Sequence, residues 1–130
     1  MPDAVPRYVI APAAEEDIAS ILSWTHAQFG EQARLRYEAL LTQAIMDVVD
    51  SPDLRGGANR PEIAPAAKTY HLFHSRNHVG AKSARVKAPR HFLLYRTRTD
   101  GLVEIGRVLH DSMDLNEHIP EDFRLPRGDA

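Results

Sequence analysis

The chain has 130 residues and a mass of 14.6 kDa, which suffices for one domain with a single hydrophobic core. With 43% hydrophobic and 26% charged residues, no cysteine and no apolar stretch of roughly 20 residues, the composition excludes a disulfide framework, a thiolate metal site and a membrane span. The net charge is −2. Because the chain has no cysteine and its first ten residues show no secretory signal, we expect a cytoplasmic protein.

The first half of the chain predicts a strand followed by two helices. Residues 7–11 alternate as a short strand, and Pro12 suits the first turn of a helix. Apolar residues then recur at helical spacing up to Phe29, and Gly30 is a natural helix stop. A second apolar stripe, 33–49, ends before Pro52. With about one residue between them, the two helices should form an antiparallel hairpin.

The second half predicts three strands. Residues 52–67 contain three prolines and a Gly-Gly pair and are expected to form a surface loop. The predicted elements after it are a strand at 69–75, a long loop at 76–90, a strand at 91–97, a turn at Asp100-Gly101, a returning strand at 102–109 and a short amphipathic helix before Pro120.

The expected fold class is therefore α+β, in the order β-α-α-β-β-β, with a helical hairpin packed on a small, mainly antiparallel sheet. We expect one domain, 1–124, with Phe123 packing back on it, and a C-terminal tail, 125–130.

Positive charge is concentrated in one stretch of the chain. Residues 1–65 carry five basic and ten acidic side chains, whereas residues 66–130 carry eleven basic and eight acidic ones. Between residues 68 and 98 there is no acid, and the basic residues are Lys68, Arg76, Lys82, Arg85, Lys87, Arg90, Arg96 and Arg98. The stretch predicts an anionic partner, either nucleic acid or an acidic protein segment, although 82–90 alone could be a solvated loop.

Sequence motifs in the expected helices and in the last two expected strands resemble one family. The segment 14–21 (AEEDIASI), followed by Gly30, Ala33 and Tyr37, resembles the helical part of the RelE/ParE superfamily of toxins from bacterial type II toxin–antitoxin systems. The strand segments 92–96 (FLLYR) and 107–114 (RVLHDSMD) are most similar to the ParE branch, and the likeness covers about residues 7–120.

The resemblance implies the same β-α-α-β-β-β fold and a set of partners. Members of the ParE branch are understood to act on DNA gyrase and to be neutralised by a cognate antitoxin. That antitoxin would be a ParD-like protein with a ribbon-helix-helix domain, through which alone the toxin would reach operator DNA. No cofactor and no membrane association are implied.

Two alternative functions remain open. The RelE branch cleaves mRNA on the ribosome with basic side chains and, commonly, a tyrosine near the C-terminus. Arginines and near-neutral histidines could support such phosphoryl chemistry, but residues 111–130 contain no tyrosine. The other alternative is an inactive module that serves only as a corepressor with its antitoxin.

Metal binding and nucleophilic catalysis find little support in the residues. His71, His74 and His78 are clustered, but on a strand His71 and His74 would point to opposite faces, and no carboxylate is near in sequence. There is no Gly-x-Ser-x-Gly segment and no phosphate-binding glycine loop. We therefore expect neither a catalytic group nor a metal.

The candidate site residues fall into two sets. The residues expected to contact the toxicity target are Arg76, Arg90, Arg96, Arg98, Arg107 and His110. The residues expected to contact the antitoxin are Trp24, Tyr37, Lys82, Arg85 and Lys87.

Structural roles are the alternative for several of these residues. Arg107 shares strand alternation with the apolar Val103 and Ile105, so it is either an internally paired structural arginine or a functional one. His110 is expected to bond to Asp111 or Asp114. Trp24 is expected at a helix boundary or partly exposed toward a partner, and Tyr95 is expected in the core.

Overall fold

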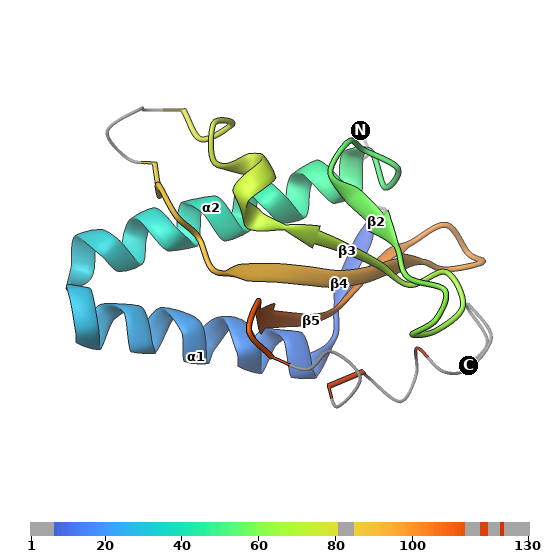
Figure 1. Cartoon of the computed structure of the whole chain (residues 1–130), viewed down its shortest axis with the longest axis horizontal. Helices are drawn as coiled ribbons and strands as arrows, with labels where there is room; N and C mark the ends of the chain where they lie inside the picture. The colour runs from blue at the N-terminus through green and yellow to red at the C-terminus, as the bar shows by residue number, and fades with distance from the viewer. Residues whose placement is uncertain (1–6, 81–84, 114–117, 120–122, 124–130) are drawn as a thin grey trace.

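Two long helices and a five-stranded sheet make up the part of the chain that the computed structural model describes, residues 7–80, 85–113, 118–119 and 123 (Figure 1). The elements, in chain order, are β1 (Tyr8–Ile10), α1 (Pro12–Phe29), α2 (Glu31–Asp50), β2 (Gly57–Asn59), β3 (Lys68–His71), the 3₁₀ helix η1 (Leu72–Ser75), β4 (His91–Thr97) and β5 (Val103–His110).

The sheet has the strand order β1-β5-β4-β3-β2. All neighbouring strands are antiparallel except β1, which pairs with β5 in parallel, so that the first and last strands of the described residues lie side by side. This arrangement confirms the expected α+β fold with a mainly antiparallel sheet.

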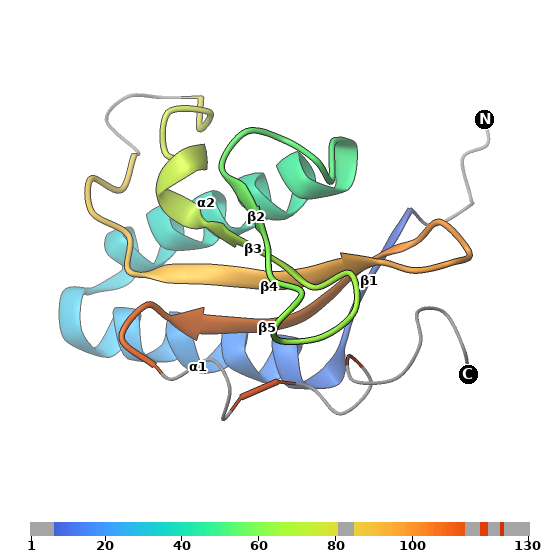
Figure 2. The same cartoon turned by 45° about the vertical axis from the view of Figure 1, so that its right-hand side comes forward.

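The helices form the expected hairpin and cover one face of the sheet (Figures 1 and 2). Gly30 alone separates them; it has a positive φ of 94°, which a glycine adopts without steric cost. The apolar stripe of α2 is buried against the sheet and includes Leu40, Ala44 and Val48. Burial of this stripe, and not helix capping by side chains, holds the hairpin in place, since neither helix has a side-chain N-cap.

Two elements differ from the sequence prediction. The predicted strand 69–75 ends at His71, and Leu72–Ser75 form a 3₁₀ helix instead. Within the predicted loop 52–67, residues Gly57–Asn59 form the edge strand β2, which pairs with β3. Its residues, Gly-Ala-Asn, carry no hydrophobic alternation, so only the backbone pairing makes this segment a strand. The short helix predicted before Pro120 falls largely on residues outside the described ones.

A β-bulge in β5 changes which side chains face the helices. Leu94 is opposite Arg107 and Tyr95 is opposite Ile105, which leaves Gly106 as an extra residue in β5. Val108 therefore joins Ile105 in the core under the helices, and Arg107 does not. The expectation that Arg107 shares a face with Val103 and Ile105 was wrong, because simple alternation does not hold across a bulge.

The other face of the sheet is partly covered by a second apolar cluster. It contains Leu94 from β4, three residues of the segment after β2 (Ile63, Ala64 and Ala67) and Phe123, which is fully buried as expected. Among the described residues, no helix is long and apolar enough to cross a membrane.

Candidate functional site

An open groove of about 870 Å³ lies where the turn of the helical hairpin meets the start of β4 and the end of β5. Its wall is largely apolar, with Ile21, Trp24 and Phe29 from α1, Val86 from the segment before β4 and Met113 from the segment after β5. Trp24 and Phe29 remain 57% and 67% exposed, and their rings meet edge to face at 5.7 Å. Large exposed apolar side chains gathered in a hollow indicate a binding surface.

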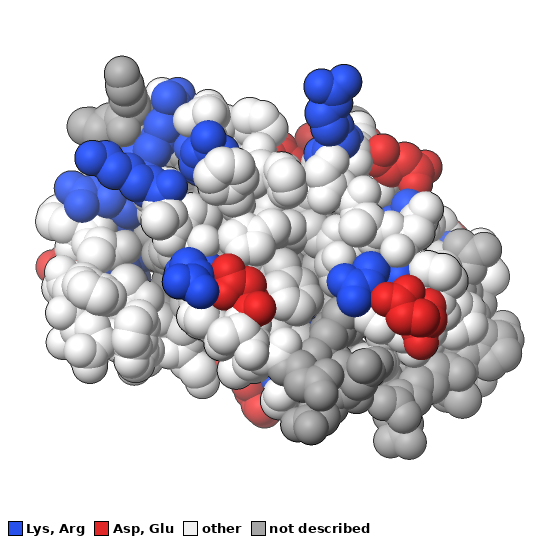
Figure 3. All heavy atoms as spheres, in the orientation of Figure 1, with Lys and Arg blue, Asp and Glu red and all other residues white. Residues whose placement is uncertain are grey.

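The groove has a positively charged rim. Arg36 lines it from α2, and Arg85, Lys87 and Arg90 line it from the segment before β4, whereas no acidic side chain among the described residues does. Figure 3 shows Lys and Arg side chains gathered at this end of the molecule, at the upper left. The rim thus carries a local positive field on a protein whose net charge is −2.

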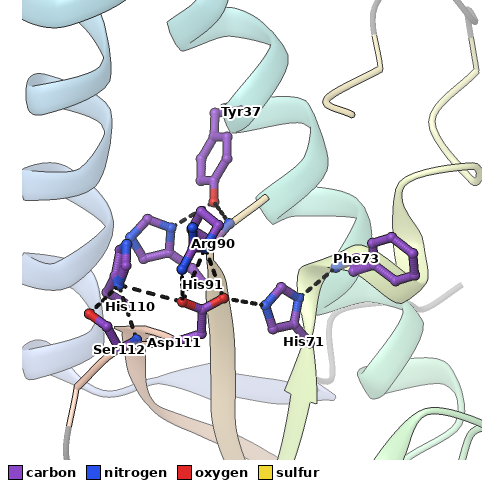
Figure 4. Close-up of polar contacts among 8 residues, drawn as sticks. All are labelled: Tyr37, His71, Phe73, Arg90, His91, His110, Asp111 and Ser112. Atoms are coloured by element: carbon purple, nitrogen blue, oxygen red, sulfur yellow. Dashed lines mark hydrogen bonds and ion pairs between the residues drawn. The ribbon is translucent and has the colours of Figure 1, made fainter. Parts of the chain in front are cut away.

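At the inner end of the groove, Tyr37 links α2 to the start of β4 (Figure 4). The Tyr37 hydroxyl accepts a hydrogen bond from the backbone N–H of Arg90 at 3.2 Å and lies 2.6 Å from Nδ1 of His91. Burial raises the pKa of Tyr37 to about 12, so the hydroxyl keeps its proton and can donate it to His91. Burial, helped by the neighbouring His110, lowers the pKa of His91 to about 4, so this imidazole is neutral at physiological pH. A neutral ring that accepts at Nδ1 carries its proton on Nε2.

Asp111 ties the ends of three strands together beside this contact (Figure 4). Its carboxylate accepts hydrogen bonds from the Arg90 guanidinium at 3.0–3.2 Å and lies 3.1 Å from Nε2 of His71. The hydrogen bonds from Arg90 are the main cause that lowers the pKa of Asp111 to about 2. His110 is bonded to Ser112 at 2.8 Å, and its Nδ1 lies 3.6 Å from the carboxylate of Asp111, one of the two expected partners. The other expected partner, Asp114, lies outside the described residues.

The structure places most of the residues expected to contact the antitoxin around one groove. Trp24, Tyr37, Arg85 and Lys87 all line it, although they come from three segments of the chain. Lys82 lies outside the described residues. Of the two alternatives for Trp24, exposure is the one observed.

The residues expected to contact the toxicity target are dispersed. Arg90 and His110 lie at the groove end of the sheet, and Arg98 lies at the opposite end of β4, bonded to Asp100 at 2.8 Å. Arg76 stacks on the Phe73 ring, with 3.5 Å between its guanidinium carbon and the ring centroid. These side chains therefore do not form one clamp.

Two arginines of that set have structural partners instead. Arg96 is 5% exposed; it bonds to Glu104 at 2.9 Å and lies over the Phe123 ring. The expectation that Arg96 is a surface contact was wrong, because Glu104 and Phe123 cover its side chain. Arg107 bonds to Asp17 of α1 at 2.7 and 2.9 Å, which corresponds to the structural alternative. The same carboxylate accepts the N–H of Val108, at the edge of β5 beyond the end of β1.

Sequence reasoning missed the roles of Asp17, Asp111 and Phe29. Asp17 lies 90 positions from its partner Arg107, and the Asp111 pairings join residues up to 40 positions apart. No carboxylate is near the clustered histidines in sequence, but the fold brings Asp111 next to His71. Even so, the described residues contain no group of three His, Cys, Asp or Glu side chains that could hold a metal ion.

Comparison with known proteins matches residues 8–115 to the family model described as the ParE toxin of the type II toxin–antitoxin system, parDE. The sequence is also 26% identical, over 113 residues, to Toxin ParE1 of Mycobacterium tuberculosis, in strains CDC 1551 / Oshkosh and ATCC 25618 / H37Rv. That alignment covers 87% of this chain and 97% of Toxin ParE1. The segment matched by the family model contains every helix and strand described above.

Proposed function

Because the chain belongs to the ParE family of toxins from type II toxin–antitoxin systems, we propose that it arrests bacterial growth by inhibiting DNA gyrase and that a cognate antitoxin neutralises it. The resemblance to the ParE branch is thereby confirmed at the level of the family. A toxin of such a system pairs with an antitoxin. The first part of the proposal concerns the site on this protein at which the antitoxin binds.

The apolar groove beside the hairpin turn is the observation that carries this part of the proposal. An amphipathic helix binds by laying its apolar face into a groove of this kind, and Trp24, Phe29 and Met113 offer the matching apolar contacts. The partner is the C-terminal segment of a ParD-like antitoxin, disordered alone and helical once bound. The toxin reaches operator DNA only through the ribbon-helix-helix domain of that antitoxin.

The basic rim selects for acidic residues on the antitoxin segment. Arg36, Arg85 and Lys87 are not balanced by an acidic side chain among the described groove residues, so carboxylates of the partner would supply the opposite charge. Charge complementarity of this kind mainly raises the association rate and sets the register of the bound helix.

Gyrase inhibition, and not RNA cleavage, is the toxic activity that we propose. Residues 111–130 contain no tyrosine of the kind that the RelE branch commonly uses. The described groups best suited to acid–base chemistry are also engaged with each other, since His91 bonds to Tyr37 and Arg90 bonds to Asp111. The toxin would act in the cytoplasm by binding gyrase and stabilising its cleaved DNA complex.

Two assays on the purified protein test the target. We expect it to inhibit supercoiling by DNA gyrase and to leave ribosome-bound mRNA intact. A codon-positioned cut in mRNA at stoichiometric toxin, with supercoiling unaffected, would refute the gyrase proposal in favour of the ribosome-dependent endonuclease.

A variant pair tests the antitoxin site with the protein encoded by the adjacent reading frame. Trp24→Ala combined with charge reversal at Lys82, Arg85 and Lys87 is expected to weaken antitoxin binding by more than tenfold, measured by titration calorimetry. Reversal at the exposed Arg55, which does not line the groove, is the control. Undiminished affinity in the groove variant would show that the antitoxin binds elsewhere.

A second variant set tests which arginines contact the target. Arg90 is exposed, and Arg76 and Arg98 are partly exposed. Neutralising the three together is expected to relieve growth arrest with little loss of antitoxin binding, because the charge of Arg90, the one of them that lines the groove, is already balanced by Asp111. Arg→Lys changes should already weaken toxicity if the contacts are bidentate, because lysine cannot form them. Arg96 is left unchanged in this set because its replacement would disturb the fold. Full toxicity of the triple alanine variant would direct attention to the segment 111–119.

A further inference from the structure

The aromatic pair in the groove presents a surface on which a flat ring could stack. Trp24 is the only tryptophan of the chain, more than half of it is exposed, and the edge-to-face contact with Phe29 supports the indole from one side. Apolar surface of this size is seldom left in solvent without a binding role.

Unpaired positive charge lies directly beside that aromatic surface. Arg36 and Lys87 line the groove, are exposed and make no ion pair within the described part of the chain. The Arg85 Nε donates to the backbone carbonyl of Val79 at 3.0 Å, which orients the guanidinium without neutralising it. Three cations therefore border the groove in addition to Arg90, whose charge is balanced by Asp111.

The inner end of the groove adds a hydrogen-bond donor. The Tyr37–His91 contact places the proton of His91 on Nε2, and His91 lines the groove. The backbone N–H of Ser112 at the same end is already bonded to Nδ1 of His110. Stacking surface, cations and donors to polar ring edges together are the features with which proteins hold a nucleotide of an unpaired strand.

We propose that this groove binds single-stranded nucleic acid, with one base stacked on Trp24 and the adjoining phosphates held by Arg36, Arg85 and Lys87. The biological role of this binding rests on the proposed function, because the cleaved gyrase–DNA complex would supply the single-stranded DNA. Antitoxin and nucleic acid then compete for one groove, so that neutralisation would be direct displacement.

Binding to a labelled oligothymidylate of about twelve nucleotides, followed by fluorescence anisotropy, tests the proposal. We expect saturable binding at low salt, with quenching of the Trp24 emission by the unlabelled oligonucleotide. With three phosphates neutralised, the logarithm of the binding constant should fall with the logarithm of salt concentration with a slope of about −2.

Three variants separate stacking from charge. Trp24→Ala is expected to weaken binding roughly 5- to 150-fold, the loss of one stacked base. Lys87→Gln should reduce the salt slope by about 0.7, the effect of one phosphate contact. Arg55→Gln makes the same change of charge outside the groove and should leave both the affinity and the slope unchanged.

Three outcomes would overturn the proposal. These are no binding to the oligonucleotide at low salt, equal affinity of the Trp24→Ala variant, and equally strong binding of thymidine monophosphate, which would assign the groove to a free nucleotide. Competition by poly-glutamate is expected, because the proposed antitoxin segment is acidic and uses the same groove. Gyrase inhibition without oligonucleotide binding would refute this inference alone, whereas oligonucleotide binding without gyrase inhibition would refute the proposed target alone.

Discussion

Replacing Arg96 with alanine should destabilise the protein far more than replacing any exposed arginine. Arg96 and Glu104 face each other across β4 and β5, their side chains are only 6% and 12% exposed, and 2.9 Å separates Nε from the carboxylate oxygen. The guanidinium also covers the Phe123 ring, with its central carbon 4.5 Å from the ring centroid. Removing Arg96 leaves the Glu104 carboxylate buried without its partner.

The expected loss is large compared with the stability of a domain of this size. Breaking a buried ion pair on one side costs about 3–5 kcal/mol, against a total free energy of unfolding of about 5–15 kcal/mol. For a chain of this length, 1 kcal/mol corresponds to about 4 °C in Tm, so the Arg96→Ala variant should melt about 12–20 °C lower. Replacing both partners by apolar residues, as in Arg96→Met with Glu104→Leu, should recover most of the loss because no buried charge remains.

Urea and thermal unfolding followed by circular dichroism measure these differences. Arg7→Ala is the control, since Arg7 and Asp50 form an ion pair with both side chains about 60% exposed, and its loss should cost less than about 1 kcal/mol. The reasoning is refuted if Arg96→Ala costs no more than the control, or if the double variant is less stable than the single one.

Three further variants probe the sheet ends and the edge of β5. The pKa of His91 is about 4 in the folded protein and 6.5 in the unfolded chain, so its contribution to stability is complete above pH 6.5 and is lost as the pH drops toward 4. The loss should be about 2 kcal/mol after allowance for partial exposure, and the urea midpoint of His91→Asn should lack this decline. The lowered pKa of Asp111 contributes stability above about pH 4 that is lost on acidification toward pH 2, and Arg90→Gln should flatten the urea midpoint in that lower window. Asp17→Ala leaves a partly buried arginine and a strand-edge N–H without their acceptor and should lower the free energy of unfolding by about 2–3 kcal/mol, whereas an unchanged urea midpoint would show that water replaces the carboxylate.

Elements with strong periodicity were predictable from the sequence, and elements defined by pairing were not. The two helices and the strand 91–97 follow directly from apolar spacing and from Pro12 and Gly30. The strand β2 has no such pattern, because its conformation comes from its hydrogen bonds with β3. The bulge at Gly106 depends on the register with β4 and therefore could not be read from β5 alone.

The candidate site was predictable in composition but not in geometry. The acid-free stretch gave the charge of the rim, and the expectation about Trp24 left room for its exposure. The contact between Tyr37 and His91 joins residues 54 positions apart, and that between Asp17 and Arg107 joins residues 90 apart. Contacts of this kind depend on topology, which a single sequence does not encode as a local pattern.

The parallel pairing of β1 with β5 bears on when the toxin can become active during its synthesis. Tyr8, Val9 and Ile10 take their strand partners from Val103, Glu104 and Ile105. The nascent chain therefore cannot complete its sheet until β5 has been translated. Contacts of such long sequence separation also form slowly, because a large loop must close before they contribute. The groove beside the hairpin turn, whose wall includes His110 at the end of β5 and Met113 after it, is therefore complete only after β5 has emerged and paired.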